Sequence, residues 1–157
     1  MIDFEKNNIH FVFRVAGIAL HDGMILLHRS AFDDFWALPG GRCELLENSK
    51  DTLEREMKEE LEIEIIVNRL LFVVENFFKY KKVPYHELGI YYLMKIPKSH
   101  WPNNQNLSFT GREGKIKLIF KWFKIEKLPE IEVYPTFLKL KIKDIKNYPE
   151  HIIHQDN

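Results

Sequence analysis

The sequence predicts a mixed α/β fold in which five or more strands form the body and two helices cover it. Runs of β-branched and aromatic residues, separated by turn residues, predict the strands. One segment, residues 48–61, changes to the period of an amphipathic helix. The chain has 157 residues, 45% of them hydrophobic, which is enough for one domain with a buried core. We therefore expect a single domain over residues 1–157.

Charge and cysteine content exclude several classes of partner and location. Lys plus Arg and Asp plus Glu number 23 each, so no net positive charge draws the chain to nucleic acid. The single cysteine, Cys43, cannot form an internal disulfide, and the N-terminus lacks a signal pattern, so we expect a cytoplasmic protein. The longest apolar runs are much shorter than the roughly 20 residues that span a bilayer, so we expect no membrane insertion.

The N-terminal part reads as two strands followed by a loop. Residues 9–30 form two β-branched and aromatic runs on either side of Asp22-Gly23, a strong hairpin signal. Residues 31–41 carry turn residues and end in Pro39-Gly40-Gly41. Because glycine has no side chain, backbone at this point can approach a ligand closely.

The first helix has its own start signal and a buried stripe. Asn48 is placed as an N-cap, with Asp51 three residues later to complete a capping pair. Leu53, Met57 and Leu61 then repeat at every fourth position, which predicts one apolar face.

The rest of the chain reads as strands, one loop and a closing helix. Three strands are expected within 63–78, 86–96 and 116–125, and a loop at 101–114. Residues 134–147 predict an amphipathic helix with Pro135 in its first turn. The short polar tail that follows, with His151 and His154, is expected to be disordered.

Three carboxylates share one face of the first helix. At about 100° per residue, Glu56, Glu59 and Glu60 fall within an arc of about 100° beside the apolar stripe, where like charges repel. One account is a solvated helix with ion pairs between residues four apart, such as Arg55 with Glu59. That account explains Glu56 and Glu60 poorly, since no cationic residue lies four positions from either. A divalent cation such as Mg²⁺, which prefers oxygen ligands, would neutralise them.

The spacing around these glutamates resembles the Nudix box of the Nudix hydrolase family. Gly41 is followed after five residues by Glu47, and after seven more by the run 55–63, "REMKEELEI". Three further features match the family's layout: the hairpin before the box, the segment "FWALPGG" that leads into it, and "KWFKIEKLPE" before a last helix. The resemblance therefore covers nearly the whole chain. One position departs: Glu62 stands where the family usually has Gly. It implies either strained backbone or a different helix end.

The resemblance implies a Nudix-type α/β/α sandwich around a mixed sheet, and an activity. Members of the family cleave a diphosphate linkage in nucleoside diphosphate derivatives or nucleoside triphosphates, using Mg²⁺ or Mn²⁺. By position, Glu59 and Glu60 would be metal ligands, Glu56 a ligand or the base for the attacking water, and the carbonyl of Gly40 a further ligand. Arg55 would belong to the catalytic group and pair with Glu47. Gly41 and Glu47 would brace the loop against the helix.

Several further residues are candidates, each with an ordinary structural alternative. Glu44 and Glu87 are candidates for an extra ligand or base. Arg14, Arg29 and Arg42 are candidates for phosphate contact, because forked guanidinium groups match phosphate oxygens. Tyr80 lies 17 residues past Ile63, close to a spacing associated in relatives with dinucleoside polyphosphate cleavage.

The sequence leaves the substrate and the assembly open. Family members with this box act on oxidised nucleoside triphosphates, ADP-ribose, sugar nucleotides, dinucleoside polyphosphates or capped RNA. The expected partner is a small nucleotide-type diphosphate; a homodimer is compatible with the sequence, whereas a nucleic-acid partner is disfavoured. The alternative function is a Nudix-fold nucleotide-binding or regulatory module that has lost turnover, and Glu62 is the one box residue in its favour.

Overall fold

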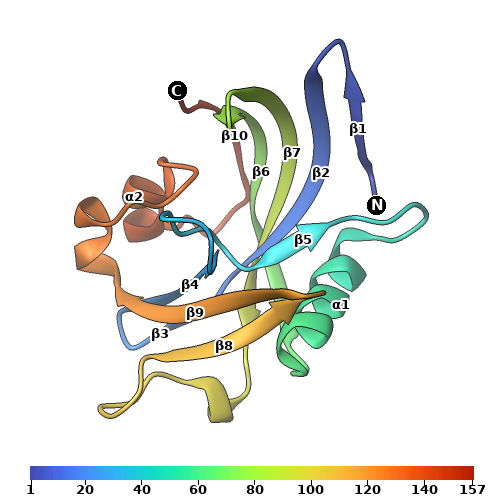
Figure 1. Cartoon of the computed structure of the whole chain (residues 1–157). Coiled ribbons are helices and arrows are strands. Elements are labelled where there is room, and N and C mark those ends of the chain that lie inside the picture. Colours follow the sequence, from blue (N-terminus) through green and yellow to red (C-terminus); the bar gives the residue numbers. More distant parts are fainter.

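The computed structural model describes residues 1–157 and contains two β-sheets with helices on opposite sides (Figure 1). The six-stranded sheet has the order β1-β2-β7-β6-β10, with β5 paired to β2; the four-stranded sheet has the order β3-β4-β9-β8. The strands are β1 (Asp3–Lys6), β2 (Ile9–Ile18), β3 (Leu20–His21), β4 (Met24–Ser30), β5 (Gly40–Arg42), β6 (Ile66–Tyr80), β7 (Val83–Lys95), β8 (Ser108–Glu113), β9 (Ile116–Lys124) and β10 (Glu150–Gln155). The helices are α1 (Ser49–Leu61) and α2 (Leu138–Lys141), with short 3₁₀ turns η1 (Lys98–His100), η2 (Ile125–Glu130) and η3 (Ile142–Asp144).

The larger sheet is mixed, as expected. Strand β2 runs parallel to β7, and β10 runs parallel to β6, whereas β6 and β7 are antiparallel. A parallel pair needs a long connection, which is why the two partners of each parallel pair lie far apart in the sequence.

Two apolar clusters fill the space on either side of the sheets and fix the layers. One joins the buried face of α1, with Leu53 and Met57, to sheet residues such as Trp122. The other joins Leu138 and Ile142, from α2 and η3, to the opposite side of the sheets. The predicted α/β/α arrangement is therefore confirmed, although the second helical layer is short. No helix is both long and apolar enough to cross a bilayer.

The local signals in the first half of the chain are confirmed. Asp22 and Gly23 both adopt positive φ, 48° and 73°, and link β3 to β4 in a tight hairpin. Asn48 caps α1, and its side chain accepts a hydrogen bond from the backbone N–H of Asp51. Glu62 follows α1 with φ 58° and ψ 27°, so the left-handed turn is kept with a non-glycine residue.

Three expectations for the second half were wrong. The segment 101–114 is not all loop, because residues from Ser108 pair with β9 as strand β8. Residues 134–147 do not form one amphipathic helix: only α2 and η3 are helical, and this segment begins with a cis Tyr134-Pro135 bond. The tail is not disordered. His151 and His154 lie in β10, which pairs with β6 and is seen beside it in Figure 1.

Candidate active site

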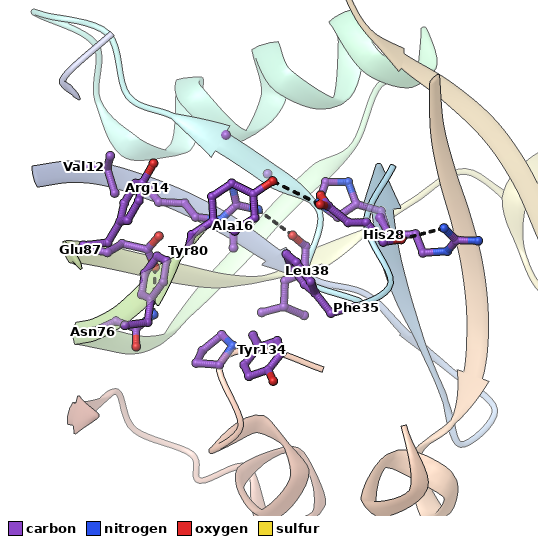
Figure 2. A pocket seen from close by; sticks show the side chains of 18 of the residues that line it. Val12, Arg14, Ala16, His28, Phe35, Leu38, Asn76, Tyr80, Glu87 and Tyr134 are labelled. Carbon is purple, nitrogen blue, oxygen red and sulfur yellow. Dashed lines mark hydrogen bonds between the residues drawn. The ribbon is translucent and has the colours of Figure 1, made fainter. Parts of the chain in front are cut away.

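A cavity of about 550 Å³ opens between the two sheets, beside α1. Strands β2, β4, β5, β6 and β7 all contribute to its wall, together with the segment around Tyr134 and the end of the chain. Figure 2 shows Asn76, Tyr80 and Glu87 on one side of it and His28 on the other.

Gly40 and Gly41 bring the loop close to the glutamates of α1. Gly40 has φ 152°, and a Cβ atom at Gly41 would lie 2.1 Å from Cδ of Glu56. A side chain at Gly41 would therefore displace the carboxyl group of Glu56 from its present position. The brace role of Gly41 stays a prediction.

Arg55 ties this loop to the helix through a set of charged hydrogen bonds. Its Nε donates to Oε2 of Glu47 at 2.8 Å and its Nη2 donates to Oε1 at 3.0 Å. Nη2 also donates to the backbone carbonyl of Arg42, and Nη1 to Glu56. The hydrogen bonds from Arg55 lower the pKa of Glu47 to about 2. This forked pair is the arrangement expected for a structural brace.

The two inner glutamates of α1 lie in a desolvated setting. The Glu60 side chain is only 3% exposed and that of Glu56 12%. Burial, together with the negative charge of Glu56, raises the pKa of Glu60 to about 9. Burial also raises the pKa of Glu56, although Arg55 opposes that shift. Glu60 therefore lacks a paired positive charge, whereas the partly desolvated Glu56 has one in Arg55.

The Glu59 side chain is exposed, unlike those of Glu56 and Glu60. Its side chain is 59% exposed and accepts a hydrogen bond from Nη1 of Arg55 at 3.3 Å. Of the ion pairs between residues four apart on this helix, this is the one that forms. In this arrangement no three His, Cys, Asp or Glu side chains converge closely enough to hold a metal ion by themselves.

The residues present nevertheless suit a divalent cation. Oε2 of Glu60 is buried without a hydrogen-bond partner, and a buried unpaired carboxylate oxygen is unfavourable. The neighbouring donors, Glu56 and the loop at Gly40, supply the oxygen ligands that Mg²⁺ and Mn²⁺ prefer.

A second carboxyl group, that of Glu87, also lines the cavity. Glu87 on β7 and Asn76 on β6 face each other in the register, and Nδ2 of Asn76 donates to Oε1 of Glu87 at 3.3 Å. Burial raises the pKa of Glu87. Arg14 on β2 donates Nη2 to the carbonyl of Leu38 at 2.8 Å. The positive charge of Arg14 opposes the pKa rise of both Glu60 and Glu87.

The other sequence candidates are divided between the cavity and the surface. Arg29, Arg42 and Tyr80 line the cavity. Arg29 lies over the ring of Trp36 and donates to the carbonyl of Asp33, whereas the Tyr80 hydroxyl donates to the Asp33 carboxylate at 3.1 Å. Arg42 forms an ion pair with Asp3. Glu44 binds the N-terminal amino group of Met1, outside the cavity.

Sequence reasoning missed several residues of the cavity. His28 follows Met24 and Leu26 on the face of β4 that packs toward α1, and Asn76 follows Phe72 and Val74 on one face of β6. A polar residue that continues an apolar series was the available signal for both. Tyr134 and Asp156 also line the cavity, but their segments come near it only through the tertiary fold.

Three aromatic residues that line the cavity pack against one another. The ring of Phe35 meets Tyr80 and Tyr134 edge-on, at centroid distances of 6.1 Å and 5.5 Å. Trp36 instead packs against Phe123, and Phe32 is 84% exposed. Of the aromatic residues in this loop, Phe35 is therefore the one whose ring joins the cavity wall.

Comparison with known proteins identifies the family of this chain. The family profile described as NUDIX domain matches residues 11–141. A Bacillus subtilis (strain 168) protein, YjhB, described as a candidate ADP-ribose pyrophosphatase, is 33% identical over 78 residues, or 49% of this chain and 38% of that protein. The match therefore spans well under half of that relative.

Solved structures show the same fold. A crystal structure of an ADP-ribose pyrophosphatase from Streptococcus suis has a TM-score of 0.58 at 16% identity, covering 91% of this chain and 98% of that one. A MutT Nudix hydrolase from Burkholderia pseudomallei has a TM-score of 0.58 at 25% identity, covering 83% and 96%. With a family match over most of its length, a shared fold, and the box glutamates on α1 beside the cavity, this chain belongs to the Nudix family.

Proposed function

We propose that this chain hydrolyses the diphosphate linkage of a nucleoside diphosphate derivative or a nucleoside triphosphate, with Mg²⁺ or Mn²⁺ as cofactor. The observation that carries the proposal is the pair of desolvated carboxyl groups, Glu56 and Glu60, beside the Gly40-Gly41 loop at the edge of a cavity. This pair suits a divalent cation, and the adjoining space suits a substrate.

The box residues take the metal-binding and water-activating roles. Glu59 and Glu60, with the carbonyl of Gly40, would hold the cation, and Glu56 would be a ligand or the base that accepts a proton from the attacking water. Bound there, the cation would neutralise the diphosphate oxygens, which otherwise repel a nucleophile. Arg55 keeps Glu47, Glu56 and the loop carbonyl of Arg42 in fixed positions, so its contribution is orientation.

Arg14 is the best placed of the three arginines for the phosphate groups. Its charge acts on the carboxyl groups of both Glu60 and Glu87, and no carboxylate forms an ion pair with it. Arg42 instead pairs with Asp3, and Arg29 lies over Trp36 and donates to a backbone carbonyl. A guanidinium without a carboxylate partner is free to bind phosphate oxygens. Glu87 remains a candidate for an additional ligand or base, whereas the contact of Glu44 with the N-terminus supports a structural role.

The nucleoside part of the substrate would lie against Phe35, Tyr80 and Tyr134. Such aromatic surfaces stack on bases, and all three residues line the cavity. The two ADP-ribose pyrophosphatase descriptions among the similar proteins make ADP-ribose the first compound to test. The lysines at 79 and 81, which also line the cavity, favour a polyanion.

The test is a release assay across a substrate panel. Phosphate, nucleoside monophosphate and sugar phosphate products would be measured for ADP-ribose, sugar nucleotides, nucleoside triphosphates and dinucleoside polyphosphates. Each assay would be run with Mg²⁺, with Mn²⁺ and with a chelator. Metal-dependent cleavage of one class supports the proposal and names the substrate. No turnover on any class, while each compound still raises the melting temperature, would instead support the binding-module alternative.

The binding-module alternative gains nothing from Glu62. Its residue type departs from the box, but its backbone keeps the left-handed turn that the usual glycine would provide. The local geometry at the end of α1 therefore gives no reason for lost turnover.

A further inference from the structure

Two buried polar atoms on facing elements lack hydrogen-bond partners and lie close together. Nδ1 of His28, on β4, and Oε2 of Glu60, on α1, are 4.0 Å apart. Their side chains are 12% and 3% exposed. Native structures rarely leave two such groups unsatisfied side by side, so the pair calls for an explanation.

The two atoms do not satisfy each other. A separation of 4.0 Å is too long for a hydrogen bond between nitrogen and oxygen. The backbone of His28 is held in place, because its N–H and carbonyl both pair with Ala37, at 2.8 Å and 2.9 Å. Its ring packs against Phe120 at a centroid distance of 5.3 Å. Something between the two atoms would satisfy both.

We propose that His28 is a nitrogen ligand of the metal site, and that Nδ1 of His28 and Oε2 of Glu60 bind the same divalent cation. Metal bonds to imidazole nitrogen and carboxylate oxygen are about 2.0–2.2 Å long, so two of them span a gap of up to about 4.2 Å. The observed 4.0 Å lies within that reach. This inference rests on the proposed function, which assigns Glu60 as a metal ligand.

A nitrogen ligand changes which cation the site prefers. Mg²⁺ takes oxygen ligands and gives up its water reluctantly, whereas transition-metal dications accept imidazole. With His28 bound, the chain would favour a transition-metal dication over Mg²⁺. We expect the His28→Gln substitution to weaken Mn²⁺ binding by about tenfold or more and Mg²⁺ binding far less.

The test is pulsed electron paramagnetic resonance on the full chain loaded with Mn²⁺. An imidazole ligand gives a ¹⁴N coupling to the bound Mn²⁺, and this coupling changes to that of ¹⁵N when histidine is ¹⁵N-labelled. His28 is the one histidine in ion-pair range of a glutamate on α1, so a directly bound nitrogen would be assigned to it. The labelled wild-type protein gives an answer even where a variant folds poorly.

Variants separate this inference from the proposed function. We expect His28→Gln to lose the nitrogen coupling and His151→Gln, a change on β10 where the imidazole pairs with Glu75, to keep it. Mn²⁺ binding that is lost in Glu60→Gln but shows no nitrogen coupling in the wild type would overturn the His28 assignment and leave the proposed function standing. Failure of the wild type to bind Mn²⁺ or Mg²⁺ at α1 would contradict both.

Discussion

At the scale of single residues, Glu60 combines burial with a strongly raised pKa. Without a metal it is nearly fully buried, next to Glu56, and its pKa is raised to about 9. An acid whose pKa rises on folding binds more protons in the folded state than in the unfolded state at every pH between the two values. The contribution of Glu60 to the free energy of unfolding is therefore fully present below about pH 4.5, and it is lost as the pH rises toward 9.

Substituting Glu60 by Gln should remove that loss. We expect Glu60→Gln to be more stable than the wild type at pH 8 in chelator, by at least about 1 kcal/mol, and to show a flatter stability between pH 5 and 9. Urea unfolding at several pH values measures both effects. The matched control is Glu54→Gln, an exposed site on the same helix, which should follow the wild type. A Glu60→Gln variant less stable than the wild type at pH 8 would contradict the raised pKa of Glu60 in the folded state.

The pKa of Glu47 is shifted in the opposite direction from that of Glu60. Its pKa is lowered to about 2 by hydrogen bonds from Arg55, so the pair stabilises the fold above about pH 4.5 and is lost as the pH falls toward 2. We expect Glu47→Gln to cost about 1–3 kcal/mol at pH 7 and to remove part of the wild type's acid sensitivity below pH 4.5. Glu44→Gln, three residues earlier and paired only with the N-terminus, is the control. Equal acid profiles for Glu47→Gln and the wild type would show that the Arg55 brace does not stabilise the fold.

At the scale of elements, helix α1 ends on a strained residue. Glu62 holds a left-handed conformation, which costs a residue with a side chain about 1–2 kcal/mol. Glycine avoids this cost, but its more flexible unfolded state offsets about 0.5–1 kcal/mol of the gain. We therefore expect Glu62→Gly to raise the free energy of unfolding by about 0.5–1 kcal/mol, measured by urea titration. Glu64→Gly, outside the positive-φ positions, should instead be neutral or destabilising. Loss of stability in both variants would mean that Glu62 is not strained.

Elements differ in how well local sequence predicts them. The hairpin at Asp22-Gly23 and helix α1 carry their own turn, cap and periodic signals, so the sequence was sufficient for both. Strand β10 has no such signal: a short polar tail becomes ordered because it pairs in parallel with β6, some 80 residues away in the chain. Pairing of this kind is a tertiary effect, and so is the pairing of β8 with β9.

At the scale of the whole molecule, the site is built where the two sheets and α1 meet. The box was predictable because its residues lie close together in the sequence, from Gly41 to Ile63. The other side of the cavity was not predictable from the sequence. His28 lies on β4, Asn76 lies on β6 and Asp156 follows β10, and only the fold brings these segments together. Glu87 was a candidate from its position after the box, but its partner Asn76 became visible only through the register of β6 and β7.

The most direct test of the central claim compares turnover in two variants of one helix face. Glu59→Gln and Glu54→Gln each remove one exposed carboxylate from α1, and only Glu59 belongs to the proposed metal site. On the substrate that the panel identifies, at saturating Mg²⁺ or Mn²⁺, we expect Glu59→Gln to lower kcat by about 100-fold or more and Glu54→Gln to change it less than about twofold. Full turnover in Glu59→Gln, or equal losses in both variants, would contradict the assignment of the α1 glutamates as the catalytic metal site.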